Sequence, residues 1–336
     1  MSASRHVPYC VCVPARNEAA KLPIFLAALA SQDLPKPATI VIALNNTTDS
    51  SRAVIDAAGR RFGDNLRLII DEYVFESALS HVGSARRRAM DIGADLVGGS
   101  RDAVLLTTDA DTRPPPMWIR ENLRAINDYR DIIGGRLVID ERERLPAPVR
   151  AARELWDNYW TLVRAIEDAT DPRPHDPAPR HGDHTGGSLA LTADLYRSAG
   201  GVPIVPFNED HGLVKAALVA GGRLKHPMSV WTRVSPRRDG RARGGMADAM
   251  TDLFNRVAEG EIICAPSLVH WQSRALWRRD LRRLPNGNLR IAQEEPLLPP
   301  MPHDVPLADI VSRALRQKQN ADRHTQPQSD GCVEFV

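Results

Sequence analysis

The sequence predicts an α/β fold in which a mostly parallel central sheet is flanked by helices. Short β-branched runs alternate with helical segments through the first half of the chain, and this alternation is typical of parallel sheets. The 336 residues, 43% of them apolar, can bury a large core. No segment repeats at a fixed period, which excludes solenoid architectures.

The first half contains the clearest elements. Strands are predicted by β-branched runs at residues 9–13, 39–44, 66–70 and 104–108, with a further strand at 135–139. Helices are predicted between them, at residues 22–31, 50–62 and 83–93. Pro23 is tolerable in the first of these helices because it lies in the first turn.

The second half changes in character. Residues 151–166 predict one amphipathic helix, and we expect its apolar face to pack on the sheet. Residues 170–184 are rich in Pro, Asp and His without an apolar period, which predicts a loop with freedom to move. A short strand at 188–191 and helices starting near 193 and at 211 follow.

Composition excludes several classes of protein. The formal net charge of +2 arises from 44 basic and 42 acidic residues, so the total charge does not call for a nucleic-acid partner. No run of about 18 apolar residues occurs and the N-terminus lacks a signal-peptide core, which predicts a cytoplasmic protein without a transmembrane segment. The cysteines Cys10, Cys12, Cys264 and Cys332 lack zinc-ligand spacing, and Cys10 and Cys12 are expected to be buried thiols on one side of a strand.

Two carboxylates follow the predicted strand at 104–108. Asp109 and Asp111 stand two residues apart, and in an extended chain such side chains project to the same side. Ligands of open α/β sheets bind outside the carboxyl ends of the strands. A Mg²⁺ or Mn²⁺ ion held there would keep positions open for phosphate oxygens. The alternative is that residues 109–116 only reverse the chain.

The motifs of the first half, taken in order, resemble family 2 glycosyltransferases of the GT-A fold over residues 8–234. The first strand ends in Val13-Pro14-Ala15-Arg16-Asn17-Glu18, a Thr-Asp-Ser loop follows the second strand, and Asp109-Ala110-Asp111 matches the Asp-x-Asp (DXD) motif. The resemblance implies a GT-A-like, Rossmann-like fold and a hexosyltransferase-like activity on a nucleotide sugar. It also implies a nucleotide pocket lined by Pro14, Arg16, Asn17, Glu18, Asn45, Asn46, Asp49, Asp109, Ala110 and Asp111, with Asp109 and Asp111 on the metal.

One position departs from the family pattern. Family members commonly carry an acidic residue where the second strand meets its loop, whereas this chain has Asn45 and Asn46. An amide offers a donor and an acceptor to a base edge, so we expect one of the two to contact the nucleobase of a UDP- or GDP-sugar. Alternatively, both asparagines only shape the turn.

The downstream motif Asn208-Glu209-Asp210 precedes a predicted helix and resembles the family's acidic pair. The resemblance implies that Asp210 is the catalytic base of an inverting reaction and that Glu209 orients sugar hydroxyls. The alternative is that Asp210 caps the helix, and the two roles are compatible. Gly187, within Gly186-Gly187-Ser188, resembles the stretch that forms the floor beneath the donor sugar.

Basic segments offer ligands for a diphosphate. We expect Arg86, and Arg238 and Arg241 in the glycine-flanked loop 235–245, to contact it, because guanidinium groups match phosphate geometry. A solvated surface loop is the alternative for 235–245. The basic helix predicted within 271–284 could lie on an anionic membrane, although ordinary packing is favoured. His181, Asp183 and His184 mimic a metal cluster but are expected to serve ordinary roles.

These motifs predict a GT-A domain at residues 1–290, with a nucleotide-binding part at 8–140 and an acceptor-binding, catalytic part at 141–290. Residues 291–336 predict a Pro-rich and polar tail that is largely unpacked. A nucleotidyltransferase is the main rival, but pyrophosphorylases carry a Gly-rich loop after the first strand, and residues 14–18 contain no glycine. A non-catalytic nucleotide-sugar binding module would require loss of the base or of a metal aspartate, and a zinc hydrolase at His181 to His184 ranks last.

Overall fold

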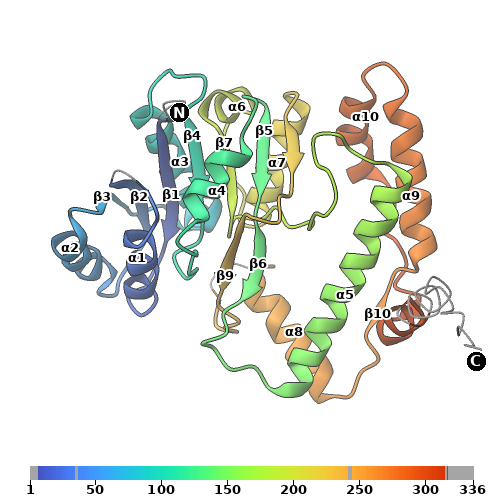
Figure 1. Ribbon diagram of the computed structural model, residues 1–336. Coiled ribbons are helices and arrows are strands. Elements are labelled where there is room, and N and C mark those ends of the chain that lie inside the picture. Colours follow the sequence, from blue (N-terminus) through green and yellow to red (C-terminus); the bar gives the residue numbers. More distant parts are fainter. Residues whose placement is uncertain (1–6, 35–36, 241–243, 315, 317–336) are drawn as a thin grey trace, which may run out of the picture.

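A computed structural model describes residues 7–34, 37–240, 244–314 and 316, so the predicted donor ligand Arg241 lies outside the described residues. A seven-stranded sheet forms the centre of the molecule (Figure 1), in the order β3-β2-β1-β4-β7-β5-β8. Its strands are β1 (Tyr9–Ala15), β2 (Ala38–Asn45), β3 (Leu66–Tyr73), β4 (Val104–Thr107), β5 (Asp131–Gly134), β7 (Leu189–Thr192) and β8 (Arg223–Lys225).

The central sheet is mostly parallel, as predicted. Strands β1 to β4 pair in parallel, and β5 pairs in parallel with β8. Strand β7 runs antiparallel to both of its neighbours, β4 and β5. Two-stranded sheets join β6 (Arg136–Ile139) to β9 (Trp231–Val234) and β10 (Cys264–Ala265) to β11 (Val305–Pro306).

The helices cover both faces of the central sheet. Helices α1, α2 and α4 contribute to the apolar core on one face, and α3, α6 and α7 contribute to the core on the other. Their bounds are α1 Leu22–Ala30, α2 Ser51–Phe62, α3 Val82–Leu96, α4 Trp118–Ala125, α6 Ala193–Ser198 and α7 Glu209–Val219. The α/β class predicted from the alternating pattern is therefore confirmed.

Strand β1 illustrates how the sequence divides the two cores. Its alternate residues Val11 and Val13 face α1, whereas Cys10 and Cys12 face α3, because successive side chains of a strand point to opposite faces. Both thiols are buried and unpaired, as expected. At Gly93 of α3, an added Cβ would lie 2.5 Å from Cys12 Sγ, so only glycine permits this close approach.

The long helix α5 (Ala147–Thr170) corrects one expectation. Its apolar side packs on α8 (Met246–Ala258) and α9 (Leu268–Arg282) instead of on the central sheet. Figure 1 shows α5 and α9 side by side, away from the sheet. The apolar period of a helix predicts that one face is buried but does not identify the partner.

The predicted tail is also corrected, because its first part is packed. Helix α10 (Gly287–Glu294) buries Ile291, and Leu307, Ile310 and Val311 join the core formed with α5. The tail was predicted from its prolines and polar residues, which outnumber these spaced apolar side chains. Residues from 317 onward lie beyond the described part, and the division at residue 140 stays a prediction.

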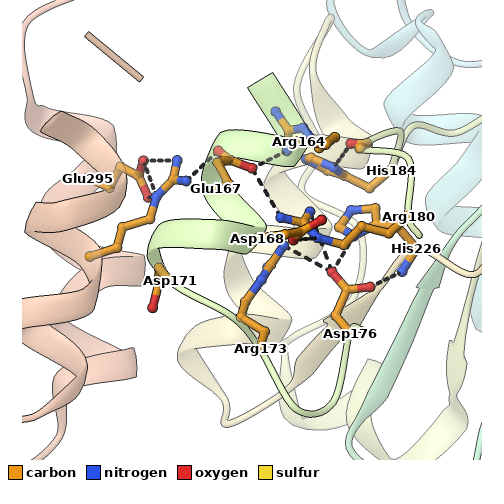
Figure 2. A network of polar contacts seen from close by, with 12 residues as sticks. Arg164, Glu167, Asp168, Asp171, Arg173, Asp176, Arg180, His184, His226 and Glu295 are labelled. Carbon is orange, nitrogen blue, oxygen red and sulfur yellow. Dashed lines mark hydrogen bonds and ion pairs between the residues drawn. The ribbon is translucent and has the colours of Figure 1, made fainter. Parts of the chain in front are cut away.

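The loop that follows α5 is fixed by buried charges, which corrects the expectation of freedom to move. Arg180, 7% exposed, contacts Glu167, Asp168 and Asp176, and Asp176 accepts a hydrogen bond from His226 Nδ1 at 2.9 Å. Figure 2 shows these side chains pointing toward one another between the end of α5 and the segment after it. A buried arginine without partners is costly, so its burial requires anionic or hydrogen-bonding partners, and local composition does not reveal them.

Several arginines of the basic helix α9 form ion pairs within the protein. In α9, Arg274 and Arg278 pair with Glu295, and Arg282 pairs with Asp171, so these arginines face the protein. No helix among the described residues is long and apolar enough to cross a membrane. Contact of this helix with a membrane surface stays the less favoured alternative.

Candidate active site

A cavity of about 510 Å³ lies at the carboxyl ends of β1, β2 and β4. It brings together most of the residues that the sequence predicted for the site. Those that line it are Pro14, Arg16, Glu18, Asn45, Arg86, Asp109, Ala110, Asp111, Gly187, Glu209 and Asp210. The segments that supply them lie far apart in the sequence, which is typical of a ligand site at the strand ends of an α/β sheet.

The predicted residues Asn17, Asn46 and Asp49 do not line this cavity. Instead, they form hydrogen bonds that join the loops next to it. Asn17 adopts a left-handed backbone (φ 51°), and its Oδ1 accepts the Thr48 N–H at 2.7 Å, which joins the first loop to the second. Asp49 Oδ2 accepts the Ala19 N–H from the other side. Asn46 exchanges two hydrogen bonds with the backbone of Phe75. Sequence patterns do not distinguish these turn-building roles from ligand contact.

Asn45 differs from Asn46 in one respect. Its Nδ2 donates to the His81 carbonyl at 3.0 Å, but its Oδ1 is buried without a hydrogen-bond partner in the described structure. An unsatisfied buried acceptor is costly, and a ligand N–H is one way to satisfy it.

Arg86 of α3 is the central cation of the site. The side chain is 3% exposed. Its Nε donates to Glu209 Oε1 at 3.0 Å, Nη1 to Thr107 Oγ1 and the Gly186 carbonyl, and Nη2 to Asp109 Oδ1 at 2.7 Å. Most of its five N–H donors are therefore used within the protein. Arg86 links the Asp-x-Asp motif to the acidic pair, and its contact with a diphosphate stays a prediction.

Gly186 is required by this arrangement. A Cβ at this position would lie 2.3 Å from Arg86 Nη2, so any side chain here would displace the guanidinium. The neighbouring Gly187 lies beside Leu137 and Asp109 and lines the cavity, and its role beneath a donor sugar stays a prediction.

Arg237 immediately precedes the predicted ligand Arg238 in loop 235–245, and it is a site residue that the sequence analysis did not select. Its Nη1 and Nη2 donate to the two carboxylate oxygens of Glu18 at 3.0 and 2.6 Å, and Nη2 lies 2.9 Å from Asp111 Oδ2. The predicted ligand Arg238 instead lies over the Phe254 ring and does not line the cavity. Two adjacent arginines on a loop carry no sequence signal that tells which one turns inward. Ser80, His81, Arg153 and Phe207 also line the cavity without having been predicted.

The carboxylates of the Asp-x-Asp motif lie in a strongly charged setting. Burial, together with the charge of Asp109, raises the pKa of Asp111 to about 6, although Arg237 opposes the shift. No group of three or more His, Cys, Asp or Glu side chains in the described ranges is arranged to hold a metal ion. Two carboxylates nevertheless suit Mg²⁺ or Mn²⁺, which commonly take one or two protein carboxylates and complete their coordination with substrate phosphates and water.

Asp210 lies in the first turn of α7 and is held by backbone donors. Its Oδ2 accepts the Gly186 N–H at 2.6 Å, and its Oδ1 accepts the His211 N–H at 2.7 Å. Burial alone would raise its pKa, but the Arg86 charge and these hydrogen bonds outweigh burial and hold the pKa below its usual range. Asp210 is therefore a fixed, ionised carboxylate that lines the cavity. The N-cap residue of α7 is Asn208, and the role of Asp210 as a base stays a prediction.

The predicted mimic of a metal cluster is a group of histidine rings. The rings of His184 and His211 lie 5.1 Å apart, and those of His181 and His226 lie 5.5 Å apart. Burial lowers the pKa of His181 and of His226 to about 4. His181 and His226 are therefore neutral at physiological pH, and the ordinary role expected of His181, Asp183 and His184 stays a prediction.

Comparisons with known proteins agree with this geometry. Residues 10–176 match the family model described as glycosyl transferase family 2. A mannosyltransferase from Pyrobaculum calidifontis, solved in complex with GDP-Man and Mn²⁺, is 18% identical with a TM-score of 0.50, and the match covers 96% of this chain and 82% of that one. It supports the GT-A fold.

More distant structures include TarS from S. aureus, with 14% identity and a TM-score of 0.48 over 82% of this chain. The match spans 44% of the TarS chain. Glucosyl-3-phosphoglycerate synthase from Mycobacterium tuberculosis is 14% identical with a TM-score of 0.41, over 77% of this chain and 83% of that one. Among curated proteins, no sequence matches this chain.

Proposed function

Because residues 10–176 belong to glycosyl transferase family 2, we propose that the protein is an inverting glycosyltransferase that moves a sugar from a nucleoside-diphosphate donor to an acceptor hydroxyl or amine. In this proposal the nucleotide-binding part spans residues 8–140 and the acceptor-binding, catalytic part spans 141–290. The observation that carries the proposal is that Asp210, the Asp-x-Asp motif and the ends of β1 and β2 line one cavity.

The reaction is a single displacement at the anomeric carbon. The acceptor oxygen or nitrogen attacks this carbon from the face opposite the diphosphate and forms the new glycosidic bond. The bond between the anomeric carbon and the diphosphate oxygen breaks, and the nucleoside diphosphate leaves with the electron pair. Asp210 takes the proton of the acceptor. Inversion of configuration follows because attack and departure occur on opposite faces.

The setting of Asp210 supports its role as the base. A carboxylate that both Gly186 N–H and His211 N–H hold in place cannot rotate away, and positioning is a large part of general-base catalysis. Its lowered pKa keeps it ionised, so that it is ready to accept a proton at neutral pH. Glu209, bound by Arg86, is suited to fix the backbone at the start of α7 and to orient a sugar hydroxyl.

A divalent cation fits the Asp-x-Asp motif of the same cavity. Asp109 and Asp111 would hold Mg²⁺ or Mn²⁺, which would neutralise the charge that develops on the departing diphosphate. The mannosyltransferase of similar fold was solved with Mn²⁺, which makes this ion the natural first choice for experiments.

The nucleobase is assigned to the Asn45 end of the cavity. The buried Asn45 Oδ1 is suited to accept a ring N–H of uracil, thymine or guanine, whereas the corresponding ring nitrogen of cytosine has no hydrogen to donate. Asn46 is already satisfied by Phe75, so of the two asparagines Asn45 is the stronger candidate.

The test is donor cleavage. Purified protein with Mn²⁺ is incubated with UDP-glucose, GDP-mannose, dTDP-glucose and a CDP-linked sugar, with water as the acceptor, and the released nucleoside diphosphate is measured. We expect slow release from one or more of the donors whose base carries a ring N–H, which are the uracil, guanine and thymine nucleotides. The sugar should appear first with the anomeric configuration opposite to that of the donor, as followed by NMR before mutarotation. Early product with retained configuration would contradict the proposal.

A further inference from the structure

Arg237 is a protein cation in contact with Asp111, one of the two carboxylates predicted to bind the metal. Its guanidinium lies against Asp111 Oδ2 and grips both oxygens of Glu18, which is 7% exposed. Asp111 follows β4 and Glu18 follows β1, and the two strands are neighbours in the sheet. The carboxylate predicted to ligate a metal therefore already has a protein cation as its partner.

The two arginines of the site differ in how firmly they are held. Arg86 is on a helix, and its donors reach a hydroxyl and a backbone carbonyl as well as carboxylates. Arg237 follows β9 on a loop, its side chain is 19% exposed against 3% for Arg86, and its described contacts are with carboxylates. A guanidinium fork binds a phosphate with the same two-pronged geometry as a carboxylate. Arg237 can thus exchange a carboxylate for a phosphate and still bind an anion with both prongs of its guanidinium.

We propose that Arg237 is an exchangeable counter-charge that competes with the divalent cation for Asp111 and moves to the donor diphosphate when both ligands bind. This inference rests on the proposed function, since it needs a diphosphate in the same cavity. Metal alone must displace Arg237 from Asp111, which weakens its binding. A nucleoside diphosphate offers Arg237 a new partner, so nucleotide and metal strengthen each other's binding, and the coupling is reciprocal.

The experiment measures Mn²⁺ affinity in the full-length protein, with the EPR signal of free Mn²⁺ as the readout. Titrations are made with Mn²⁺ alone and then with Mn²⁺ in the presence of UDP or GDP. The variants are Arg237→Gln, which removes the charge, and Arg237→Lys, which keeps it. Arg238→Gln is the matched control, because its guanidinium lies over the Phe254 ring and not on a carboxylate.

For Mn²⁺ alone, Arg237→Gln should bind on the order of tenfold more tightly than the wild type, a change typical of coupled ligands. Arg237→Lys and Arg238→Gln should stay near the wild-type affinity. Adding Asp111→Asn to Arg237→Gln should remove the gain, which places the ion at Asp111. The nucleotide should strengthen Mn²⁺ binding in the wild type and much less in Arg237→Gln.

An Arg237→Gln variant that retains a cooperative thermal transition and binds Mn²⁺ no more tightly than the wild type would overturn the inference. A gain that survives Asp111→Asn would overturn it as well, because the ion would then lie elsewhere. Failure of UDP, GDP, CDP and dTDP to bind any variant is a separate result. It would contradict the proposed donor site, whereas the titration with Mn²⁺ alone would still decide whether Arg237 competes with the ion for Asp111.

Discussion

At the scale of single residues, the site depends on carboxylates whose surroundings differ. Asp210 is held by two backbone N–H groups near Arg86, and its pKa is lowered, whereas the pKa of Asp111 is raised to about 6 by burial beside Asp109. The first setting suits a base that stays ionised, and the second suits a carboxylate that gains from a bound cation. One cavity thus contains carboxylates suited to two different tasks.

Replacement of the base gives the first prediction. Asp210→Asn should lower kcat by about 10²–10⁴-fold, because an amide cannot take the proton of the acceptor. The dissociation constant of the nucleoside diphosphate should stay within about threefold of the wild type, since Asp210 does not neutralise the diphosphate. Steady-state donor cleavage and calorimetry measure the two quantities. An Asn variant with wild-type kcat would exclude Asp210 as the base.

Asn45 gives a second prediction at this scale. Asn45→Leu should weaken binding of the preferred nucleoside diphosphate by about tenfold, the worth of one lost hydrogen bond in a buried site. Asn45→Asp keeps an acceptor oxygen and should bind more tightly than Asn45→Leu. Calorimetry with both variants checks this order. Equal affinity of wild type and Asn45→Leu would show that the base binds elsewhere.

At the scale of elements, the segment after α5 contains a buried ionic network and also leads to the cavity. Figure 2 shows its buried cluster of Arg180, Asp176 and His226. The same segment continues to Gly186, whose N–H binds the proposed base Asp210. Asp183 Oδ2 also accepts the Leu137 N–H, which ties the segment to β6. The floor of the cavity is thus held by a network that itself contacts no proposed ligand.

This network predicts a pH dependence of stability. His181 and His226 have folded-state pKa values of about 4, against a usual value of 6.5. Between pH 6.5 and 4 the unfolded chain binds more protons than the folded one, so the free energy of unfolding decreases as the pH falls through this window. The slope can reach about 1.4 kcal/mol per pH unit for each histidine. Asp176, with its pKa lowered to about 2, contributes only at lower pH.

Urea unfolding at pH 7 and pH 5 measures the effect. His226→Asn keeps a donor for Asp176 but cannot titrate, so its stability should fall less between these two pH values than that of the wild type. A wild-type fall no larger than that of His226→Asn would contradict the assignment of a buried neutral histidine.

At the scale of the whole molecule, the strands of the central sheet could be predicted from the sequence more fully than the contacts of α5 and of the buried arginines. Strands β1, β2 and β4 are continuous apolar runs that end in polar motifs, so the strands themselves and a site at their carboxyl ends could be predicted from the pattern, whereas their order in the sheet could not. The partners of α5 do not, because an apolar stripe fits a sheet or another helix equally well. Arg237 was not predicted, because its partners Glu18 and Asp111 lie far away in the sequence. The network around Arg180 was not predicted either, because a charged segment does not show which of its side chains are buried together.

The packed part of the C-terminal segment gives a prediction at this scale. Leu307 is 1% exposed in the core shared with α5, so Leu307→Ala should lower the free energy of unfolding by about 2–5 kcal/mol. Leu297 is 81% exposed, and Leu297→Ala in the same segment should change it by less than about 0.5 kcal/mol. Urea unfolding of both variants measures these two changes in the free energy of unfolding. Equal stabilities would mean that this segment does not belong to the folded unit.

The central claim is that one cavity binds a nucleoside diphosphate together with a divalent cation at Asp109 and Asp111. Calorimetry with UDP, GDP, CDP and dTDP, each with Mn²⁺ or with EDTA, tests it in the wild type and in the double variant Asp109→Ala, Asp111→Ala. We expect one nucleotide to bind best, more tightly with Mn²⁺ than with EDTA, and the advantage of Mn²⁺ to disappear in the double variant. If none of the four nucleotides binds under any condition, the donor site is wrong, and what remains is the GT-A fold without the proposed activity.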